Sequence, residues 1–121
     1  EIFLYISTAE KFQFTHYGVN ETYDWHCDSY NEPYPPEKEG LSGLTRKISM
    51  TLCLSNSNDY TGGDLQFKFR NSAEDTISTI PETREKGTMI FFPGYVWHRV
   101  APVTSGNRFS LVLWSCGNPY V

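Results

Sequence analysis

Short segments in which apolar and polar residues alternate recur along almost the whole chain, and they leave little room for helices. Residues two apart share one face of a strand, so this period predicts β-structure with one face in a core. The clearest segment covers residues 46–55, which we expect to form a central strand. Its apolar positions are Ile48, Met50, Leu52 and Leu54.

About eight such strands are predicted, separated by turns rich in Gly, Pro, Asn and Ser. Residues 29–44 interrupt them with three prolines and two glycines, which predicts a long irregular loop of the kind that is usually functional or mobile. Because a set of short strands can pair its edges in two packed sheets, the expected fold class is all-β with at most minor helix, in a jelly roll. The other segments are residues 2–6, 11–17, 23–28, 64–69, 76–80, 87–92, 98–101 and 108–116.

Charge and hydropathy exclude several classes of partner. The net charge of −4 gives no general attraction to phosphate backbones, so nucleic acid is not expected as a partner. No apolar run approaches the roughly 20 residues that span a bilayer, so no membrane role is expected either. Cys27, Cys53 and Cys116 form no CxxC pair, which argues against disulfides and fits a reducing, cytoplasmic location.

The length of 121 residues fits a single domain over 1–121 that can bury a core of its own. The chain has no initiating Met and starts directly in the strand-like residues 2–6. We therefore expect a trimmed fragment of a longer protein.

Three side chains stand out as candidate metal ligands. His26 and Asp28 lie two apart in a predicted strand, so an imidazole and a carboxylate project from the same face. His98 follows the turn at Pro93-Gly94 and can be carried back to the sheet as a third donor. Two histidines and one carboxylate on one face of an octahedral ion are typical of non-haem Fe(II) oxygenases.

Arg108 is the candidate anchor for an acidic cosubstrate. Three protein ligands leave positions open for a chelating organic acid and dioxygen, and the far carboxylate of a dicarboxylate would need a permanent, bidentate cation. Ser110 shares a strand face with Arg108 and can donate its hydroxyl to the same group. Tyr17 could add a further hydroxyl or simply pack. Arg99 is the competing cation, but it follows His98 directly and should face the opposite, solvated side.

Other conspicuous residues have simpler interpretations. His16 shares a face with Phe12 and Phe14, which predicts a core or hydrogen-bonded histidine rather than a fourth ligand. Arg46 is interpreted as a cation at the edge of a strand. The three tryptophans are interpreted as packing residues, namely Trp25, Trp97 and Trp114.

From about Phe14 to Cys116 the sequence resembles the Fe(II)- and 2-oxoglutarate-dependent oxygenases. The resemblance is to their prolyl 4-hydroxylase-like branch, which includes bacterial PKHD-type hydroxylases. The matching residues are Tyr17-Gly18, Tyr23-x-x-His26-x-Asp28, Arg46-x-x-Ser49-x-Thr51-x-x-Leu54-Ser55, Asp59-Tyr60-x-Gly62-Gly63-x-Leu65, and Pro93 through His98-Arg99-Val100-x-Pro102-Val103-Thr104-x-Gly106-x-Arg108.

The resemblance implies a double-stranded β-helix, a cupin-like barrel, with Fe(II) held by His26, Asp28 and His98. It implies that 2-oxoglutarate chelates the metal with its far carboxylate on Arg108, and that Tyr17 contacts it. Such enzymes use O₂ to convert 2-oxoglutarate to succinate and CO₂ while hydroxylating an unactivated C–H bond, with ascorbate as a reductant. The implied substrate is a prolyl residue of a peptide or protein.

Departures from the family leave alternatives open. Relatives usually carry helices ahead of the barrel that buttress the larger sheet, and almost nothing precedes it here. Free amino acids or other small molecules remain alternative substrates. The same side chains would serve a lectin-like binding module with a structural ion, or a cupin-like metal enzyme without 2-oxoglutarate, and they would also accept zinc or nickel. Arg108 argues against a closed structural site, which needs no buried cation beside it.

Overall fold

The computed structural model describes residues 6–71 and 73–120, and the predicted strand at residues 2–6 falls largely outside them. Within this part the chain forms eleven strands and two short 3₁₀ helices. No helix in it is long and apolar enough to cross a bilayer. The strands are β1 (Thr8–Ala9), β2 (Gln13–Tyr17), β3 (Tyr23–His26), β4 (Thr45–Cys53), β5 (Tyr60–Gly62), β6 (Leu65–Asn71), β7 (Glu74–Thr79), β8 (Met89–Pro93), β9 (Trp97–Val100), β10 (Val103–Gly106) and β11 (Arg108–Gly117), and the helices are η1 (Ser57–Asp59) and η2 (Pro81–Arg84).

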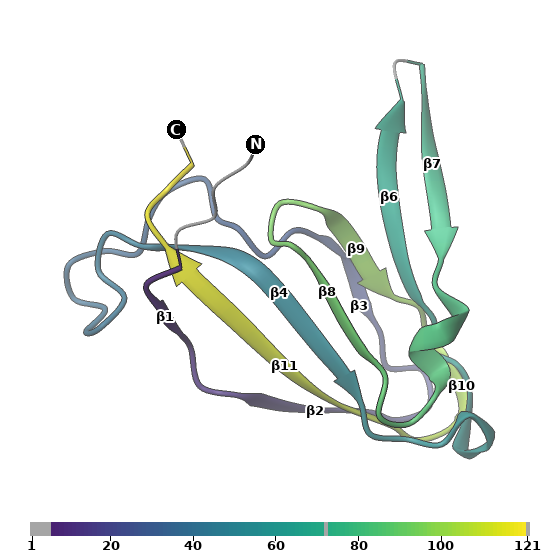
Figure 1. Ribbon diagram of the computed structural model, residues 1–121. Helices are drawn as coiled ribbons and strands as arrows, with labels where there is room; N and C mark the ends of the chain where they lie inside the picture. The colour runs from purple at the N-terminus through teal and green to yellow at the C-terminus, as the bar shows by residue number, and fades with distance from the viewer. Residues whose placement is uncertain (1–5, 72, 121) are drawn as a thin grey trace.

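Two antiparallel sheets form the body of the molecule (Figure 1). The larger has the order β1-β11-β4-β8, with β2 also paired to β11, and the smaller has the order β3-β9-β6-β7. A third, two-stranded sheet joins β10 to β5. This arrangement confirms the predicted all-β fold class and fits a double-stranded β-helix.

The core lies where the two sheets face each other. Phe67 of β6 meets Phe92 of β8 edge to face, with ring centroids 5.0 Å apart. Leu65 and Val100 complete the buried cluster from the smaller sheet. Burying such side chains stabilises the fold by roughly 1.5–3 kcal/mol each.

Strand β4 lies between β11 and β8, so the prediction of a central strand is confirmed. Both of its faces are covered in part, because Met50 is buried on one side and Ser49 on the other. Ser49 faces the interior together with Trp114, its cross-strand partner on β11. The alternating pattern therefore located the strand, while the side facing the interior of the barrel proved to be the more polar one.

Strand β2 shows the same inversion. Phe12 and Phe14 are 65% and 61% exposed, while Gln13 and Thr15 line the interior cavity. His16 is exposed rather than in a core, and its Nε2–H donates to Asn107 Oδ1 at 2.7 Å. The hydrogen-bonded interpretation of this histidine is thus confirmed, and the core interpretation is wrong.

Residues 29–44 form bends and turns without strand or helix, as predicted. Tyr34 ties this loop to the body, because its hydroxyl donates to both carboxylate oxygens of Glu10, at 3.2 and 3.1 Å. At the other end of the molecule the β6–β7 hairpin extends beyond the rest of the smaller sheet (Figure 1).

Candidate active site

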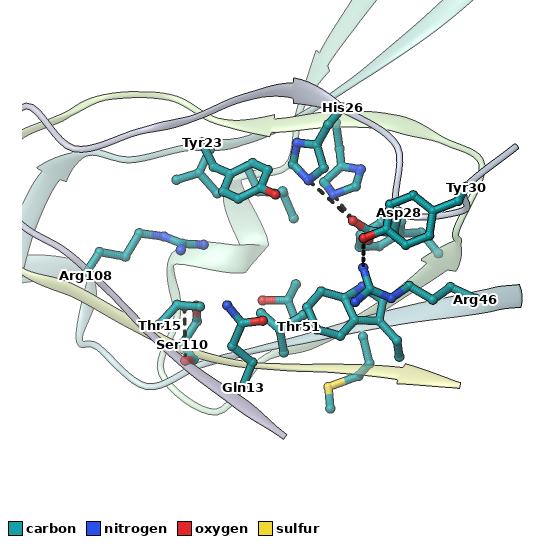
Figure 2. A pocket seen from close by; sticks show the side chains of 17 residues that line it. Gln13, Thr15, Tyr23, His26, Asp28, Tyr30, Arg46, Thr51, Arg108 and Ser110 are labelled. Atoms are coloured by element: carbon teal, nitrogen blue, oxygen red, sulfur yellow. Dashed lines mark hydrogen bonds and ion pairs between the residues drawn. The ribbon is translucent and has the colours of Figure 1, made fainter. Parts of the chain in front are cut away.

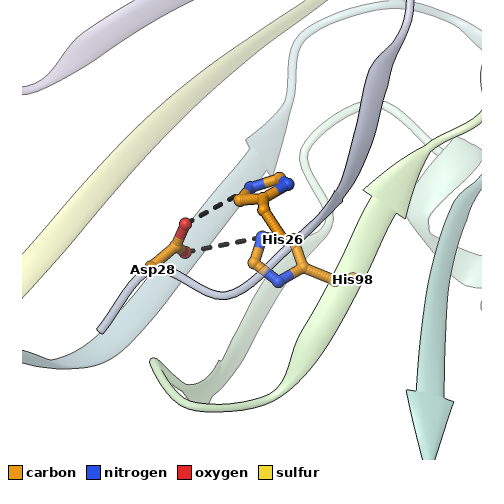
Figure 3. A group of neighbouring side chains, drawn as sticks. All are labelled: His26, Asp28 and His98. Carbon is orange, nitrogen blue, oxygen red and sulfur yellow. Dashed lines mark ion pairs between the residues drawn. The ribbon is translucent and has the colours of Figure 1, made fainter. Parts of the chain in front are cut away.

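His26, Asp28 and His98 converge between the sheets, and each offers one ligand atom within 4.8 Å of the others (Figure 3). The two histidines are register partners on the neighbouring strands β3 and β9. Their Nε2 atoms lie 3.4 and 3.5 Å from the two carboxylate oxygens of Asp28. The structure therefore brings His98 to His26 and Asp28, which precede it in the chain by 72 and 70 residues.

Backbone carbonyls fix the orientation of both imidazoles. Nδ1 of His26 is 2.6 Å from the carbonyl oxygen of Asp24, and Nδ1 of His98 is 2.9 Å from that of Val96. Because a carbonyl only accepts, each Nδ1 carries the proton and each Nε2 presents its lone pair to the centre. Hydrogen bonds from the far ring nitrogen to a carbonyl orient histidines that bind metal.

Asp28 lies two residues beyond the end of β3, so its prediction as a residue of the same strand as His26 is wrong. Instead, its backbone N–H donates to the carbonyl of Gly94 at 2.8 Å. Gly94 in turn donates to the carbonyl of Lys47 on β4 at 2.9 Å. The turn at Pro93-Gly94 thus holds the carboxylate between the sheets, and a Cβ at Gly94 would lie 2.5 Å from Ser29 Oγ.

The surroundings of Asp28 and His98 favour the protonation states in which these side chains can bind a cation. Burial alone would raise the pKa of the Asp28 carboxyl, but the adjacent His26 imidazole, a hydrogen bond from Ser49 and the nearby His98 lower it to about 2. Burial lowers the pKa of His98, against the opposing effect of Asp28. The carboxylate is ionised and His98 favours its neutral form, which are the states that bind metal.

Ser49 is a supporting residue that sequence reasoning did not assign. Its hydroxyl donates to Asp28 Oδ2 at 2.5 Å, from a side chain that is 1% exposed. We expect Ser49→Ala to weaken Mn(II) binding by about 10-fold, because the carboxylate loses an orienting donor. Titration of the metal-free protein with Mn(II), followed by electron paramagnetic resonance, measures this. Ser57→Ala, at an exposed position in η1, should bind as the wild type does; equal binding by both variants would contradict the role of Ser49.

A cavity of about 270 Å³ opens beside the three candidate ligands. Arg108 lies at one side of it, and Arg46 at the other (Figure 2). Arg108 is only 3% exposed, and its Nε has no hydrogen-bond partner among residues 6–71 and 73–120. Over the same ranges Arg108 forms no ion pair, so no Asp or Glu carboxylate of these residues neutralises its buried charge.

Ser110 and Tyr17 lie near Arg108 in different ways. Ser110 lines the cavity next to it, and its hydroxyl is 2.5 Å from that of Thr15 on β2. The Tyr17 ring lies 5.6 Å from the Arg108 guanidinium carbon and packs against the core cluster, outside the set of cavity-lining residues. The structure thus gives Ser110 direct access to a ligand in the cavity and places Tyr17 behind the arginine.

Arg99 points away from the cavity, as expected from its place next to His98. It is not fully solvated, however, because its Nε donates to Gln66 at 2.7 Å and its guanidinium lies 5.0 Å from the Trp25 ring. Trp97 is 50% exposed, so its prediction as a packing residue is wrong.

Arg46 and Trp114 belong to the cavity wall, which sequence reasoning missed. Arg46 lies 3.8 Å above the Trp114 ring and pairs with Glu10 at 2.6 Å, so it is not a free cation at a strand edge. Tyr23 also lines the cavity and packs against His26, with the ring centroids 3.9 Å apart and the ring planes tilted by 56°. Spacing could have found Trp114, because Arg108, Ser110, Val112 and Trp114 all lie two apart on β11.

The donor set and the cavity define the class of protein. Two imidazoles and one carboxylate suit a divalent transition metal, and an unpaired buried arginine nearby suits an anionic ligand. The sequence model of the 2OG-Fe(II) oxygenase superfamily matches residues 12–116. The chain belongs to this superfamily, whose members use Fe(II), 2-oxoglutarate and O₂, and the predicted family is confirmed.

Individual relatives narrow the likeness to one branch. A PKHD-type hydroxylase of Xanthomonas axonopodis pv. citri is 30% identical over 102 residues, which are 84% of this chain and 42% of that protein. The structure of a Pseudomonas putida prolyl-4-hydroxylase has a TM-score of 0.66 and 22% identity over 91% of this chain and 53% of that one. A Trichoplax adhaerens prolyl hydroxylase, in complex with a hypoxia inducible factor oxygen degradation domain peptide fragment, has a TM-score of 0.61 and 22% identity over 91% and 44%. The chain therefore spans about half or less of the length of these relatives.

Proposed function

We propose that the protein is an Fe(II)- and 2-oxoglutarate-dependent dioxygenase that hydroxylates a prolyl residue in a peptide or protein. His26, Asp28 and His98 hold the metal, and Arg108 binds the far carboxylate of 2-oxoglutarate, with Ser110 beside it. When bound, the metal together with 2-oxoglutarate and O₂ supplies the oxidising chemistry that hydroxylates an unactivated C–H bond and yields succinate and CO₂.

Buried Arg108 is the observation that carries this proposal. A charged guanidinium that is 3% exposed and has no ion pair in the described chain is costly, because burial removes its hydration. A dicarboxylate that reaches the metal centre with one end would supply the missing charge with the other. A metal-binding module with a structural ion would gain nothing from this arginine.

The protein's own groups orient the reactants and do not act as the oxidant. The Nδ1–H groups of both histidines keep the Nε2 atoms facing the centre, and Ser49 holds the carboxylate of Asp28. Leu65, Phe92 and Val100 add apolar surface to the cavity wall beside these polar groups.

The activity can be tested by loading the protein anaerobically with Fe(II), then adding 2-oxoglutarate, air and a panel of proline-containing peptides. We expect succinate to form in the wild type and not in His98→Ala, which lacks one candidate ligand. If wild type and variant produce the same amount of succinate, the proposal is wrong.

A prolyl substrate is supported by the names of the relatives and by the shape of the site. Tyr23 and Tyr30 line the cavity, are 51% and 56% exposed and could contact a chain that continues beyond the reacting residue. Mass spectrometry should find one added oxygen on a peptide proline and none on free L-proline. The reverse result would establish a small-molecule hydroxylase instead.

A further inference from the structure

Arg108 is confined by residues that do not themselves line the cavity. Gly63 lies just before β6 with φ +66°, and a Cβ added there would lie 3.1 Å from Arg108 Cδ and 2.9 Å from Val103 Cγ2. Val103 is completely buried, and its backbone is held by hydrogen bonds with Asn20 and Glu21. A Cβ at position 63 would therefore press on both the buried Val103 and the Arg108 side chain.

Tyr60 closes the same space from β5. It is 3% exposed, and its Cε2 atom would be 3.4 Å from a Cβ at Gly63. Burial raises the pKa of its hydroxyl, and the positive charges of Arg108 and Arg84 oppose that rise. Tyr60 therefore packs beside the bare backbone of Gly63, close to both arginine side chains.

Arg84 fixes this arrangement from outside the cavity. Its guanidinium lies 4.2 Å from the Tyr60 ring and donates to the backbone carbonyls of Tyr60 and Gly62, at 2.8 and 2.6 Å. Asp64 accepts a further bond from it at 2.9 Å and balances its charge. Arg84 thus has a carboxylate partner of its own, whereas Arg108, on the cavity side, is left free for a ligand.

We propose that Gly63 and Tyr60 are positioning residues for Arg108, because together they form a slot that aims its guanidinium into the cavity. This inference rests on the proposed function, in which Arg108 anchors 2-oxoglutarate. The slot needs glycine at position 63 because a Cβ there would lie closer to Arg108 Cδ and Val103 Cγ2 than ordinary packing allows. At position 60 it needs an aromatic ring.

Two readouts test the slot. The first is the side-chain Nε–H resonance of Arg108 in ¹⁵N nuclear magnetic resonance spectra, assigned by its loss in Arg108→Lys. The second is the Kd for 2-oxoglutarate in the Mn(II)-loaded protein. We expect Gly63→Ala to shift the resonance and to raise this Kd about 10-fold, because the bidentate contact between a guanidinium and a carboxylate depends on the position of the guanidinium. Mn(II) binding should not change.

Gly43→Ala is the matched control. Gly43 has a similar φ of +73°, but a Cβ there would meet nothing within 4 Å, so it tests the backbone strain alone. Tyr60→Phe should bind 2-oxoglutarate as the wild type does, while Tyr60→Leu should weaken it and still bind Mn(II).

The proposal is overturned if Gly63→Ala leaves the Arg108 resonance in place, if Gly43→Ala moves it equally, or if Gly63→Ala loses Mn(II) as well. A shift specific to Gly63→Ala in a protein that does not bind 2-oxoglutarate would uphold the slot and refute the proposed function. The two failures can therefore be distinguished.

Discussion

Asp28→Asn is expected to reduce the affinity for Mn(II) or Fe(II) by more than about 100-fold. This exceeds the loss of affinity that follows removal of a residue that only orients a metal ligand. Asp28 is the only anionic group among the three candidate ligands, and its pKa of about 2 means that it carries its full charge at neutral pH. Asparagine keeps the shape and the carbonyl oxygen but removes this charge from a largely buried place. Succinate formation should fall to background with it.

Asp75→Asn provides the matched control, because Asp75 is exposed on β7 of the projecting hairpin. Isothermal titration of both variants with Mn(II) separates loss of the site from a general effect of charge. The amide variant should keep its fold, because Ser49 can still donate to the remaining carbonyl oxygen. Wild-type metal affinity in Asp28→Asn would mean that the three side chains do not form the metal centre.

Local periodicity predicted most strands because each presents one face to a core or a cavity. Residues 46–55 were predicted and β4 covers Thr45–Cys53, with the last residues bending away toward η1. The pairing of β5 with β10 was not predicted, because both segments are rich in Gly, Thr and Ser and read locally as turns. The paired residues of β5 and β10 lie more than forty residues apart in the chain, and a local sequence pattern does not predict a contact at that separation.

The hydrophobic pattern did not predict which face of the larger sheet lies inside the barrel. Phe14 faces outward while Thr15 and Ser110 face inward, because the interior at that end is a polar cavity rather than a core. A sequence pattern shows that two faces differ, but it does not show which of them encloses a ligand.

The candidate ligands could be found from the sequence because residue chemistry and the order of the motifs single out His26, Asp28 and His98, although Asp28 lies beyond the strand that was predicted to carry it. The supporting residues could not. Ser49 reaches Asp28 only through the packing of the two sheets, and Arg46 joins the cavity through its contacts with Glu10 and Trp114. Such contacts depend on strand register, including the irregularity between Ser115 and Cys116 on β11.

Arg108→Ala is expected to raise the Kd for 2-oxoglutarate by about 100-fold while Mn(II) binding persists. A bidentate bond between a guanidinium and a carboxylate away from water contributes roughly 1.5–3 kcal/mol, which corresponds to a factor of about 10 to 100. Arg108 is not within reach of the candidate metal ligands as a hydrogen-bond donor, so its removal should leave them in place. Equilibrium titration of the Mn(II)-loaded protein with 2-oxoglutarate measures the effect.

Two further variants define the cause. Arg108→Lys keeps the charge but loses the planar fork, so it should restore part of the affinity and not all of it. Arg99→Ala removes a guanidinium that points to the outer face and should bind 2-oxoglutarate as the wild type does. Loss of Mn(II) in Arg108→Ala would show that the arginine supports the metal centre rather than the cosubstrate. An effect of Arg99→Ala as large as that of Arg108→Ala would indicate a response to overall charge, because the two arginines face opposite sides of the barrel wall.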